Sequence, residues 1–240
     1  MSAKIIIISD CHLSRNNELL FKKYDVEKNI QLLDTMIQQE NPDCIFVLGD
    51  ISQDGSPESY IKAKHQFEKY QKPVYFIPGN HDDLDNIKTL ESSLIRSTPY
   101  LDIVDHRFIF VNTKLDNSDS GFISDTELNK IRRHRHPDKI NHLIMHHHFL
   151  PLNSFLDKFI LTTPEGLISI VNENWLNSIF TGHIHNGIMK TYGNTNIYHS
   201  PSTCVQFALT RELVLENVIG YRVINLDSKN LTSYVKLLQL

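Results

Sequence analysis

The stretch that decides the fold is Lys4-Ile-Ile-Ile-Ile-Ser9-Asp10-Cys11-His12, in which four isoleucines run directly into polar residues. A short, continuous β-branched run of this kind is typical of a strand that is buried on both of its faces. The aspartate and the histidine stand where that strand would end. We therefore expect a buried strand over residues 4–9 that delivers Asp10 and His12 to the edge of a sheet.

Four further runs have the same apolar character and alternate with helical patterns. These runs are Cys44–Leu48, Val74–Ile77, Phe108–Asn112 and His142–Met145. A helix is indicated between the first two strands, where Val26, Ile30, Leu33 and Ile37 recur at helical spacing. We expect Asp25 to cap this helix and Asn41-Pro42 to end it. Further helices are expected over 57–70 and from the capping-box pattern Ser124–Glu127 toward Arg135. The alternation predicts an α/β fold.

The end of the chain changes character after His185, where strand patterns follow one another at 187–191, 196–199, 221–226 and 233–237. The polar run Asn112–Gly121 is the best loop candidate. Neither a repeat nor a linker-like stretch divides the chain. With 240 residues, 40% of them hydrophobic, the chain is expected to form a single domain over residues 1–240.

The overall charge and the start of the chain limit the possible partners. A formal charge of −4 gives no basic footprint for nucleic acid, whereas a small anionic substrate remains compatible because bound cations dominate the local charge. The apolar run near the start is shorter than a signal-peptide core or a membrane span. We expect a cytoplasmic protein with no membrane partner. The basic cluster Arg132–His136 has two interpretations, a phosphate-binding patch or a solvated helix end, and the second is the simpler.

The three cysteines, Cys11, Cys44 and Cys204, are an odd number without paired spacing, which argues against a disulfide framework. Cys44 and Cys204 are interpreted as core thiols. Cys11 lies between two polar residues and has two interpretations. It is either a redox-sensitive thiol at the site or a small core residue, and alternation at a strand end favours the core residue.

Five polar motifs stand directly after expected strands. They are Asp10-Cys-His12, Gly49-Asp50, Gly79-Asn80-His81-Asp82, His146-His-His148 and Gly182-His183-Ile-His185. In open α/β sheets, functional groups collect beyond the carboxyl ends of the strands, so these distant motifs are expected to meet. Carboxylate, carboxamide and imidazole ligands without a thiolate suit manganese, iron or zinc. The glycine before several of these ligands would allow a sharp turn or a close approach of the backbone.

The order of these motifs resembles the calcineurin-like metallophosphoesterase superfamily, whose pattern is D-x-H, G-D, G-N-H-D, a histidine after a strand and G-H-x-H. The match covers nearly the whole chain. The resemblance implies an αββα sandwich of two mixed β-sheets flanked by helices, with two metal ions, iron and/or manganese or alternatively zinc. It implies a first metal held by Asp10, His12, Asp50 and His185, and a second held by Asp50, Asn80, His146 and His183. Asp50 would bridge the pair.

The triple histidine leaves the choice of one ligand open among three residues. We choose His146 because it directly follows the apolar run Leu143–Met145. His147 and His148 are then expected to contact substrate or to support the ligands, and further substrate contacts are expected from the residues Asn80, His81 and His185. His81 matches the histidine that the family places near the leaving oxygen, so it is the catalytic candidate beside Asp50. Its alternative role is to orient Asn80, and Asp82 is expected to support the ligands from behind.

Three stretches resemble the bacterial class III 3′,5′-cyclic-nucleotide phosphodiesterases in particular. They are the triple histidine before Phe149-Leu-Pro151, the stretch Ser200–Phe207, and Gly220-Tyr-Arg222. The resemblance implies hydrolysis of 3′,5′-cyclic AMP, and of other cyclic nucleotides or phosphodiesters, to the nucleoside 5′-monophosphate. Two divalent ions, two aspartates and a bridging hydroxide would leave about one positive charge for a phosphodiester, which that hydroxide would attack in line.

Other activities are the alternatives. A phosphomonoesterase or a pyrophosphohydrolase of the same superfamily is the nearest, although the lipid-A pathway pyrophosphohydrolases usually have arginine where His81 stands. A non-enzymatic scaffold is disfavoured because every expected ligand is present. The expected partner is a small cyclic nucleotide, and the chain is expected to be a monomer or a homodimer.

Overall fold

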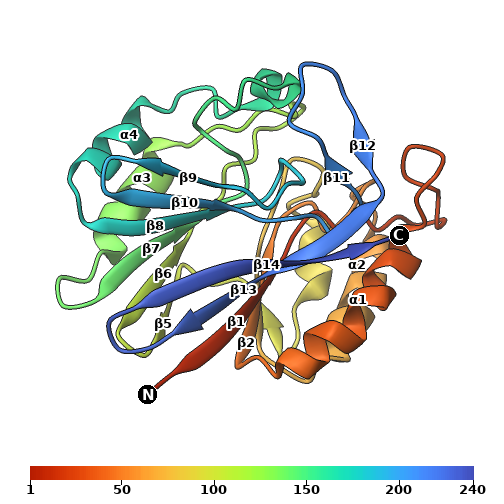
Figure 1. Ribbon diagram of the computed structural model, residues 1–240, viewed down its shortest axis with the longest axis horizontal. Coiled ribbons are helices and arrows are strands. Elements are labelled where there is room, and N and C mark those ends of the chain that lie inside the picture. Colours follow the sequence, from red (N-terminus) through yellow and green to blue (C-terminus); the bar gives the residue numbers. More distant parts are fainter.

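The computed structural model describes residues 1–240 and contains two six-stranded sheets with helices on their outer faces (Figure 1). The first sheet has the spatial order β14 (Leu231–Gln239), β13 (Val218–Leu226), β1 (Ala3–Ile8), β2 (Cys44–Leu48), β3 (Val74–Ile77) and β4 (Ile95–Arg96). The second has the order β5 (Tyr100–Ile103), β6 (His106–Phe110), β7 (Ile140–Ile144), β8 (Leu176–Thr181), β10 (Thr195–His199) and β9 (Met189–Tyr192). Both sheets mix parallel and antiparallel pairs. In the first sheet, β1 is parallel to β2 and antiparallel to β13. In the second sheet, β7 is parallel to β8, and β9 is antiparallel to β10.

Four helices flank the two sheets. The helices α1 (Val26–Glu40) and α2 (Pro57–Glu68) lie outside the first sheet, and α3 (Asp125–His134) and α4 (Glu165–Asn172) lie outside the second (Figure 1). Two short 3₁₀ helices, η1 (Asn86–Leu90) and η2 (Phe155–Phe159), and a small hairpin of β11 (Gln206–Phe207) and β12 (Leu215–Glu216) complete the fold. The expected αββα sandwich of two mixed sheets is confirmed.

The isoleucine run of β1 shows why the sheets stack in this way. Ile5 and Ile7 pack between the two sheets, together with Phe46 of β2 and Phe108 of β6. Ile6 and Ile8 point to the opposite face, where they join the side chains of α1 and α2. A third cluster lies between the second sheet and the helices α3 and α4. Because side chains alternate along a strand, the four isoleucines of β1 contribute to two of the three hydrophobic clusters.

The helix boundaries follow the capping chemistry that the sequence indicates. Asp25 caps α1 by accepting a hydrogen bond from the backbone N–H of Lys28 at 3.0 Å, and Asn41 ends it in a left-handed conformation. Ser124 likewise accepts from the backbone N–H of Glu127 at 3.2 Å. The reciprocal half of the expected capping box is replaced, because the Glu127 carboxylate accepts from the backbone N–H of Asn112 at 2.9 Å.

Some elements lie elsewhere than expected or were missed. The strands expected at 108–112 and 142–145 are β6 and β7, and each begins two residues earlier. Strand β8 was not among the expected ranges because Asn177 and Ser178 interrupt its apolar pattern. The last two strands are longer than expected, since β13 and β14 pair over nine residues each.

The remaining expectations concern single residues. All three cysteines are free and buried, and Cys11, at 1% exposure, packs in the core under α1, so the core interpretation of that thiol is confirmed. The basic cluster lies at the end of α3, before β7 begins, whereas the polar motif of β7 follows its other end. It is therefore a helix end remote from the site. None of the helices combines the length and the apolar character that crossing a membrane requires.

Candidate metal centre

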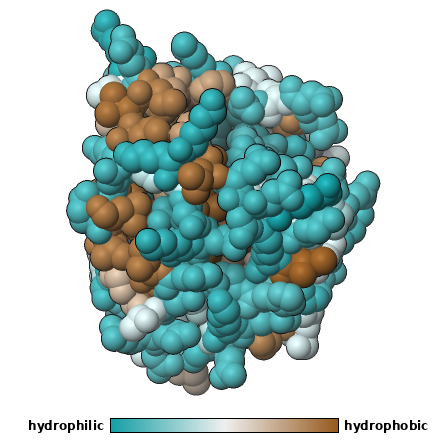
Figure 2. Space-filling model, turned by 90° about the vertical axis from the view of Figure 1, so that its right-hand side faces the viewer, coloured by the Kyte–Doolittle hydropathy of each residue, from teal (hydrophilic) through white to brown (hydrophobic).

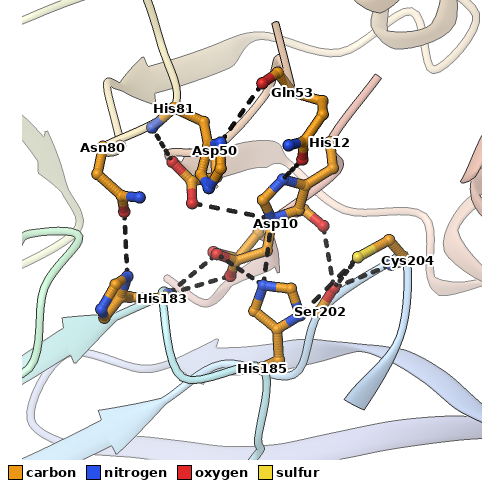
Figure 3. A network of polar contacts seen from close by, with 12 residues as sticks. Asp10, His12, Asp50, Gln53, Asn80, His81, His183, His185, Ser202 and Cys204 are labelled. Carbon is orange, nitrogen blue, oxygen red and sulfur yellow. Dashed lines mark hydrogen bonds and ion pairs between the residues drawn. The ribbon is translucent and has the colours of Figure 1, made fainter. Parts of the chain in front are cut away.

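The five polar motifs follow the ends of β1, β2, β3, β7 and β8. Figure 3 shows how the motif residues from the ends of β1, β2, β3 and β8 point toward one another. Parallel pairing aligns β1 with β2 and β3 in one sheet and β7 with β8 in the other. The ligand atoms of Asp10, Asp50 and His146, which come from both sheets, lie within 4.8 Å of one another. Asp10 and Asp50 are 0% and 2% exposed, so two carboxylates are buried side by side. Such a pair requires positive charge nearby.

The first group of ligand atoms gathers around His12 and His185. Their Nε2 atoms lie 3.2 Å apart. The Nε2 atom of His185 is 3.5 Å from Asp10 Oδ1, and that of His12 is 3.8 Å from Asp50 Oδ2. Four side chains therefore direct one atom each toward a common point.

The second group gathers around Asn80 and shares Asp50 with the first. The Asn80 Oδ1 atom lies 3.1 Å from His146 Nε2 and 3.1 Å from His183 Nδ1. His146 Nε2 is also 3.4 Å from Asp50 Oδ2. The same carboxylate oxygen thus faces both groups.

Each of the four inward-facing imidazoles is fixed by its other ring nitrogen. These outer nitrogens lie within hydrogen-bond distance of an oxygen: His12 Nδ1 at 2.7 Å from Gln53 Oε1, His146 Nδ1 at 2.6 Å from Leu48 O, His185 Nδ1 at 2.9 Å from Val205 O and His183 Nε2 at 3.1 Å from Phe159 O. A carbonyl oxygen can only accept, so the outer nitrogen carries a proton and the inner nitrogen is the one that faces the other candidate ligands. This is the arrangement of metal-binding histidines. The donor set therefore fits divalent cations.

The backbone around these residues is strained. Asp10, His12, Asp50, His183 and His185 all have positive φ angles, between 47° and 68°. This left-handed conformation is unfavourable for residues with a Cβ and typically costs about 1 kcal/mol or more each. Five such residues in one place indicate that the fold gives up stability to direct these side chains inward.

Two histidine–aspartate pairs set the electrostatics of the site. Burial alone would raise the pKa of Asp50 and lower that of His146, but their mutual attraction outweighs it: the pKa of Asp50 lies well below its usual value and that of His146 rises to about 9. Asp10 and His185 form the second pair, with shifts in the same directions. Burial lowers the pKa of His12 to about 3, so this imidazole is neutral and ready to act as a ligand.

Asp82 holds two of the ligand loops together from behind. Its carboxylate is 1% exposed and accepts hydrogen bonds from the backbone N–H groups of Ile51, Ser52 and Gly79 at 2.9–3.2 Å, and from the Tyr60 hydroxyl at 3.1 Å. Burial, followed by repulsion from Asp50, raises its pKa to about 6. The expected supporting position of Asp82 agrees with this geometry.

Two glycines permit the close approach of these loops. Gly49 has a φ angle of 86° immediately before Asp50. A Cβ on Gly79 would overlap the Asp50 carboxylate and its backbone N–H. Both positions exclude larger residues for reasons that concern the site itself.

Comparison with known proteins places this arrangement in a family. The family model described as calcineurin-like phosphoesterase matches residues 3–187, which include all five motifs. This chain belongs to the calcineurin-like phosphoesterases.

Individual relatives and a solved structure agree with this assignment. A probable cyclic nucleotide phosphodiesterase of Coxiella burnetii is 31% identical over 91% of this chain and 91% of its own length. The 3′,5′-cyclic adenosine monophosphate phosphodiesterase CpdA of Pseudomonas aeruginosa is 26% identical over 94% of this chain and 86% of its own. A dimetal phosphatase from Danio rerio superposes with a TM-score of 0.67 at 11% identity, over 96% of this chain and 98% of that one, and thus shares the fold. The chain is accordingly a hydrolase of phosphate esters.

His81 of this phosphoesterase lies at the rim of the centre. Its backbone N–H donates to Asp50 Oδ1 at 2.9 Å, and its ring packs edge-on against His12 with centroids 4.9 Å apart. The ring is half-buried and lines the cavity above the centre. Its imidazole makes no hydrogen bond to the Asn80 side chain, to which the alternative role would assign it.

The triple histidine separates into three environments. Only His146 faces Asp50 and Asn80, in line with its choice as the ligand candidate. His147 and His148 are each 0% exposed and do not line the cavity. The Nδ1 atom of His147 lies 2.8 Å from the Thr113 hydroxyl, and His148 stacks on His183 with centroids 5.6 Å apart. Both residues are thus placed to support the candidate ligands, His148 by stacking on His183, whereas their expected contact with substrate stays a prediction.

Sequence reasoning missed several residues of the phosphoesterase site. Gln53 orients His12, Lys114 donates to the Asn80 backbone carbonyl at 2.7 Å, and Ser202 donates to the Asp10 carbonyl at 2.9 Å. Cys204 was interpreted only as a core thiol, but its sulfur also lies 3.8 Å from His185 Nδ1. Gln53 stands three residues after Asp50, so its nearness to a motif could have indicated a role at the site. Lys114 lies in a loop that contains none of the motifs.

Proposed function

We propose that this chain is a dinuclear-metal phosphodiesterase that hydrolyses 3′,5′-cyclic AMP, and related cyclic nucleotides, to the nucleoside 5′-monophosphate. The observation that carries the proposal is the convergence of seven ligand side chains into two groups that share Asp50 Oδ2. The substrate class rests on the relatives named as cyclic nucleotide phosphodiesterases over nearly their whole length. Residues 1–240 would act as a single domain, since β13 and β14 pair into the same sheet as β1.

The first metal would be held by Asp10, His12, Asp50 and His185, and the second by Asp50, Asn80, His146 and His183. Manganese and iron suit this mixture of oxygen and nitrogen ligands, and zinc is the alternative. Bound divalent ions would supply Lewis acidity and make water a stronger acid at neutral pH. The protein holds the ligands in place before binding, because the outer nitrogens of the four imidazoles are already fixed.

His81 is the candidate for moving a proton. Hydrolysis forms one bond from a water oxygen to phosphorus and breaks the bond from phosphorus to O3′, which then needs a proton. The His81 ring lines the cavity and also a second, polar hollow beside it, so that it can exchange protons with solvent. An imidazole at this place can donate to the departing oxygen.

The test of His81 is the variant His81→Ala. We expect it to keep two metals per chain, measured by elemental analysis after gel filtration, and to lose about 100-fold or more in kcat. Loss of metal in proportion to activity would instead assign His81 to orienting Asn80.

The test of the function is a substrate panel after chelation and metal add-back. The panel contains cyclic AMP, cyclic GMP, a 2′,3′-cyclic nucleotide, a glycerol phosphodiester, an aryl diester and an aryl monoester. We expect the chelated protein to be inactive, manganese to restore activity, and cyclic AMP to be the preferred substrate. Activity that resists chelation contradicts the metal mechanism, and a preference for the monoester contradicts the cyclic-nucleotide assignment. Full metal loading without any hydrolysis would mark a scaffold.

A further inference from the structure

The cavity above the metal centre has two chemically different sides. Its volume is about 290 Å³. The polar floor consists of His81, Gln53, Asp119 and five of the seven candidate ligands, which are His12, Asp50, Asn80, His183 and His185. The opposite wall is apolar, and we refer to it as the aromatic wall; it consists of Leu20, Phe21, Phe155, Leu156, Phe159, Phe207 and Leu213. The floor suits the phosphate, so the wall faces whatever the phosphate carries.

The aromatic wall comes from three separate segments that meet at the mouth of the cavity. Phe21 lies between β1 and α1, Phe155 begins η2, and Phe207 belongs to the β11–β12 hairpin. The ring of Phe207 has centroid distances of 6.0 Å to Phe21 and 5.7 Å to Phe155, both edge-on. The backbone N–H of Phe155 also donates to the carbonyl of Thr210 in the hairpin at 2.9 Å. Figure 2, which faces the side of the molecule that carries β12 and the C-terminus, shows apolar patches separated by hydrophilic surface.

The aromatic wall is joined to the metal centre through Phe207. Its ring stacks on the imidazole of His185, with centroids 4.1 Å apart and planes at 4°. Its backbone N–H donates to the carbonyl of His185 at 3.0 Å. Phe207 is 8% exposed, so this ring is a fixed base for the wall and the remaining members carry its open surface.

Phe21 and Leu213 are the most exposed members of the aromatic wall, and Phe21 is held there at a cost in stability. It is 45% exposed although it lines the cavity. Phe21 and Lys22 have φ angles of 51° and 57°, and the backbone N–H of Leu20 donates to the carbonyl of Tyr24 at 2.9 Å across this turn. Two successive left-handed positions normally carry glycine, asparagine or aspartate. A phenylalanine there is strained and keeps nearly half of its surface exposed, with its edge-on contact to Phe207 as the one aromatic contact it makes, which is typical of a residue retained for binding.

We infer that the aromatic wall is the subsite that receives the nucleobase of the substrate, with Phe21 as its main specificity-determining residue. This inference rests on the proposed function and extends it from the phosphate to the base. A planar, largely apolar ring joined to a phosphate by a ribose matches an apolar wall beside a polar floor. Asp119 and Gln53 also line the cavity and offer polar groups to the edge of a base. The volume is close to the lower end of the range of small-molecule sites and suits one nucleotide-sized ligand.

The test compares two ligands that differ in the base. Adenosine 5′-monophosphate and ribose 5-phosphate carry the same phosphate on the same sugar, so the ratio of their dissociation constants measures the contribution of the base. Stacking on aromatic side chains is worth about 5- to 150-fold per base. We expect isothermal titration calorimetry of the manganese-loaded protein to give a ratio of at least about tenfold. Phe21→Ala should reduce it to about threefold or less, and Phe21→Tyr should restore it.

The control is Phe122→Ala, which removes a phenylalanine that is 37% exposed but does not line the cavity. It should leave the ratio unchanged, and thermal unfolding should show that all variants are folded. Equal affinities for the two ligands in the wild type would overturn the inference, as would a wild-type ratio that survives both Phe21→Ala and Phe155→Ala. Hydrolysis of cyclic AMP with equal affinities would leave the proposed function standing and remove only the base subsite. A ratio of dissociation constants of about tenfold or more without hydrolysis of cyclic AMP would support the base subsite and contradict the proposed function.

Discussion

The hydrogen bonds of Asp82 make a quantitative prediction about stability. Replacing this carboxylate by alanine leaves three buried backbone N–H groups and the Tyr60 hydroxyl without their acceptor. At about 2 kcal/mol for each orphaned group, the gross loss is about 8 kcal/mol. The buried carboxylate is itself disfavoured, because its pKa is raised to about 6 from 3.8 and each pKa unit is worth about 1.4 kcal/mol. Removing the disfavoured carboxylate returns about 3 kcal/mol, so the net loss in the free energy of unfolding for Asp82→Ala is about 5 kcal/mol.

The asparagine variant separates the hydrogen bonds from the charge. Each carboxylate oxygen of Asp82 accepts two of the four hydrogen bonds, so Asp82→Asn keeps one acceptor and removes the buried charge. We expect this variant to lose only about 1 kcal/mol, because two orphaned groups are nearly balanced by the relief of desolvation.

The assay is urea unfolding at neutral pH in the presence of a chelator, so that metal binding does not contribute. Thermal unfolding should show a drop in Tm of about 10 to 20 °C for Asp82→Ala, given about 2 to 4 °C per kcal/mol for a protein of this size. The control is Asp85→Asn, whose carboxylate is exposed and pairs with Lys88 at the surface; its Tm should not change. A loss below about 2 kcal/mol for alanine, or equal losses for alanine and asparagine, would refute the reasoning.

Three further predictions follow from other parts of the molecule. Gln53→Ala should weaken metal binding about 10- to 100-fold by titration calorimetry, because His12 loses the partner that fixes its tautomer, whereas Gln38→Ala on the exposed face of α1 should bind metal as the wild type does. Burial raises the pKa of Glu40, but its ion pairs with Lys236 and Lys4 outweigh this and hold the pKa below 4.5. The contribution of Glu40 to stability is therefore present above that pH and is lost as the pH falls. Glu40→Gln should lower the free energy of unfolding at neutral pH and make its decline in acid shallower. Burial raises the pKa of Cys11 and raises that of Cys44 to about 12. A thiol reagent at mildly alkaline pH should therefore label neither residue in the native protein, and all three cysteines in urea. Rapid labelling of Cys11 or Cys44 in the native protein would contradict the burial of these thiols.

The elements that the sequence predicts well are those whose signal is local. Strands β2 and β3 begin and end where their apolar runs do, and α1 begins at the cap that Asp25 provides. Strand β8 escaped because Ser178 is polar yet 0% exposed, so tertiary packing outweighs the local pattern. The first half of the capping box is local and was correct. The Glu127 carboxylate instead serves a loop 15 residues away, which no local pattern encodes.

The candidate ligands could be found from the sequence because each follows a strand and belongs to a short motif. Their support could not be found in the same way. The acceptors for the outer nitrogens of His146, His183 and His185 are backbone carbonyls, which every residue possesses. The burial of His147 and His148 depends on tertiary packing, which no local pattern encodes. The aromatic wall combines single phenylalanines from three segments and has no motif at all.

The central position of β1, between β13 and β2, has a consequence for the order of assembly during synthesis. One neighbour of β1 follows about 40 residues later, but the other follows only after about 210 residues. His183 donates to Asp10 across 173 residues of sequence, so the centre is incomplete in any shorter nascent chain. Until β13 arrives, the most apolar strand keeps one open edge on which another chain could pair.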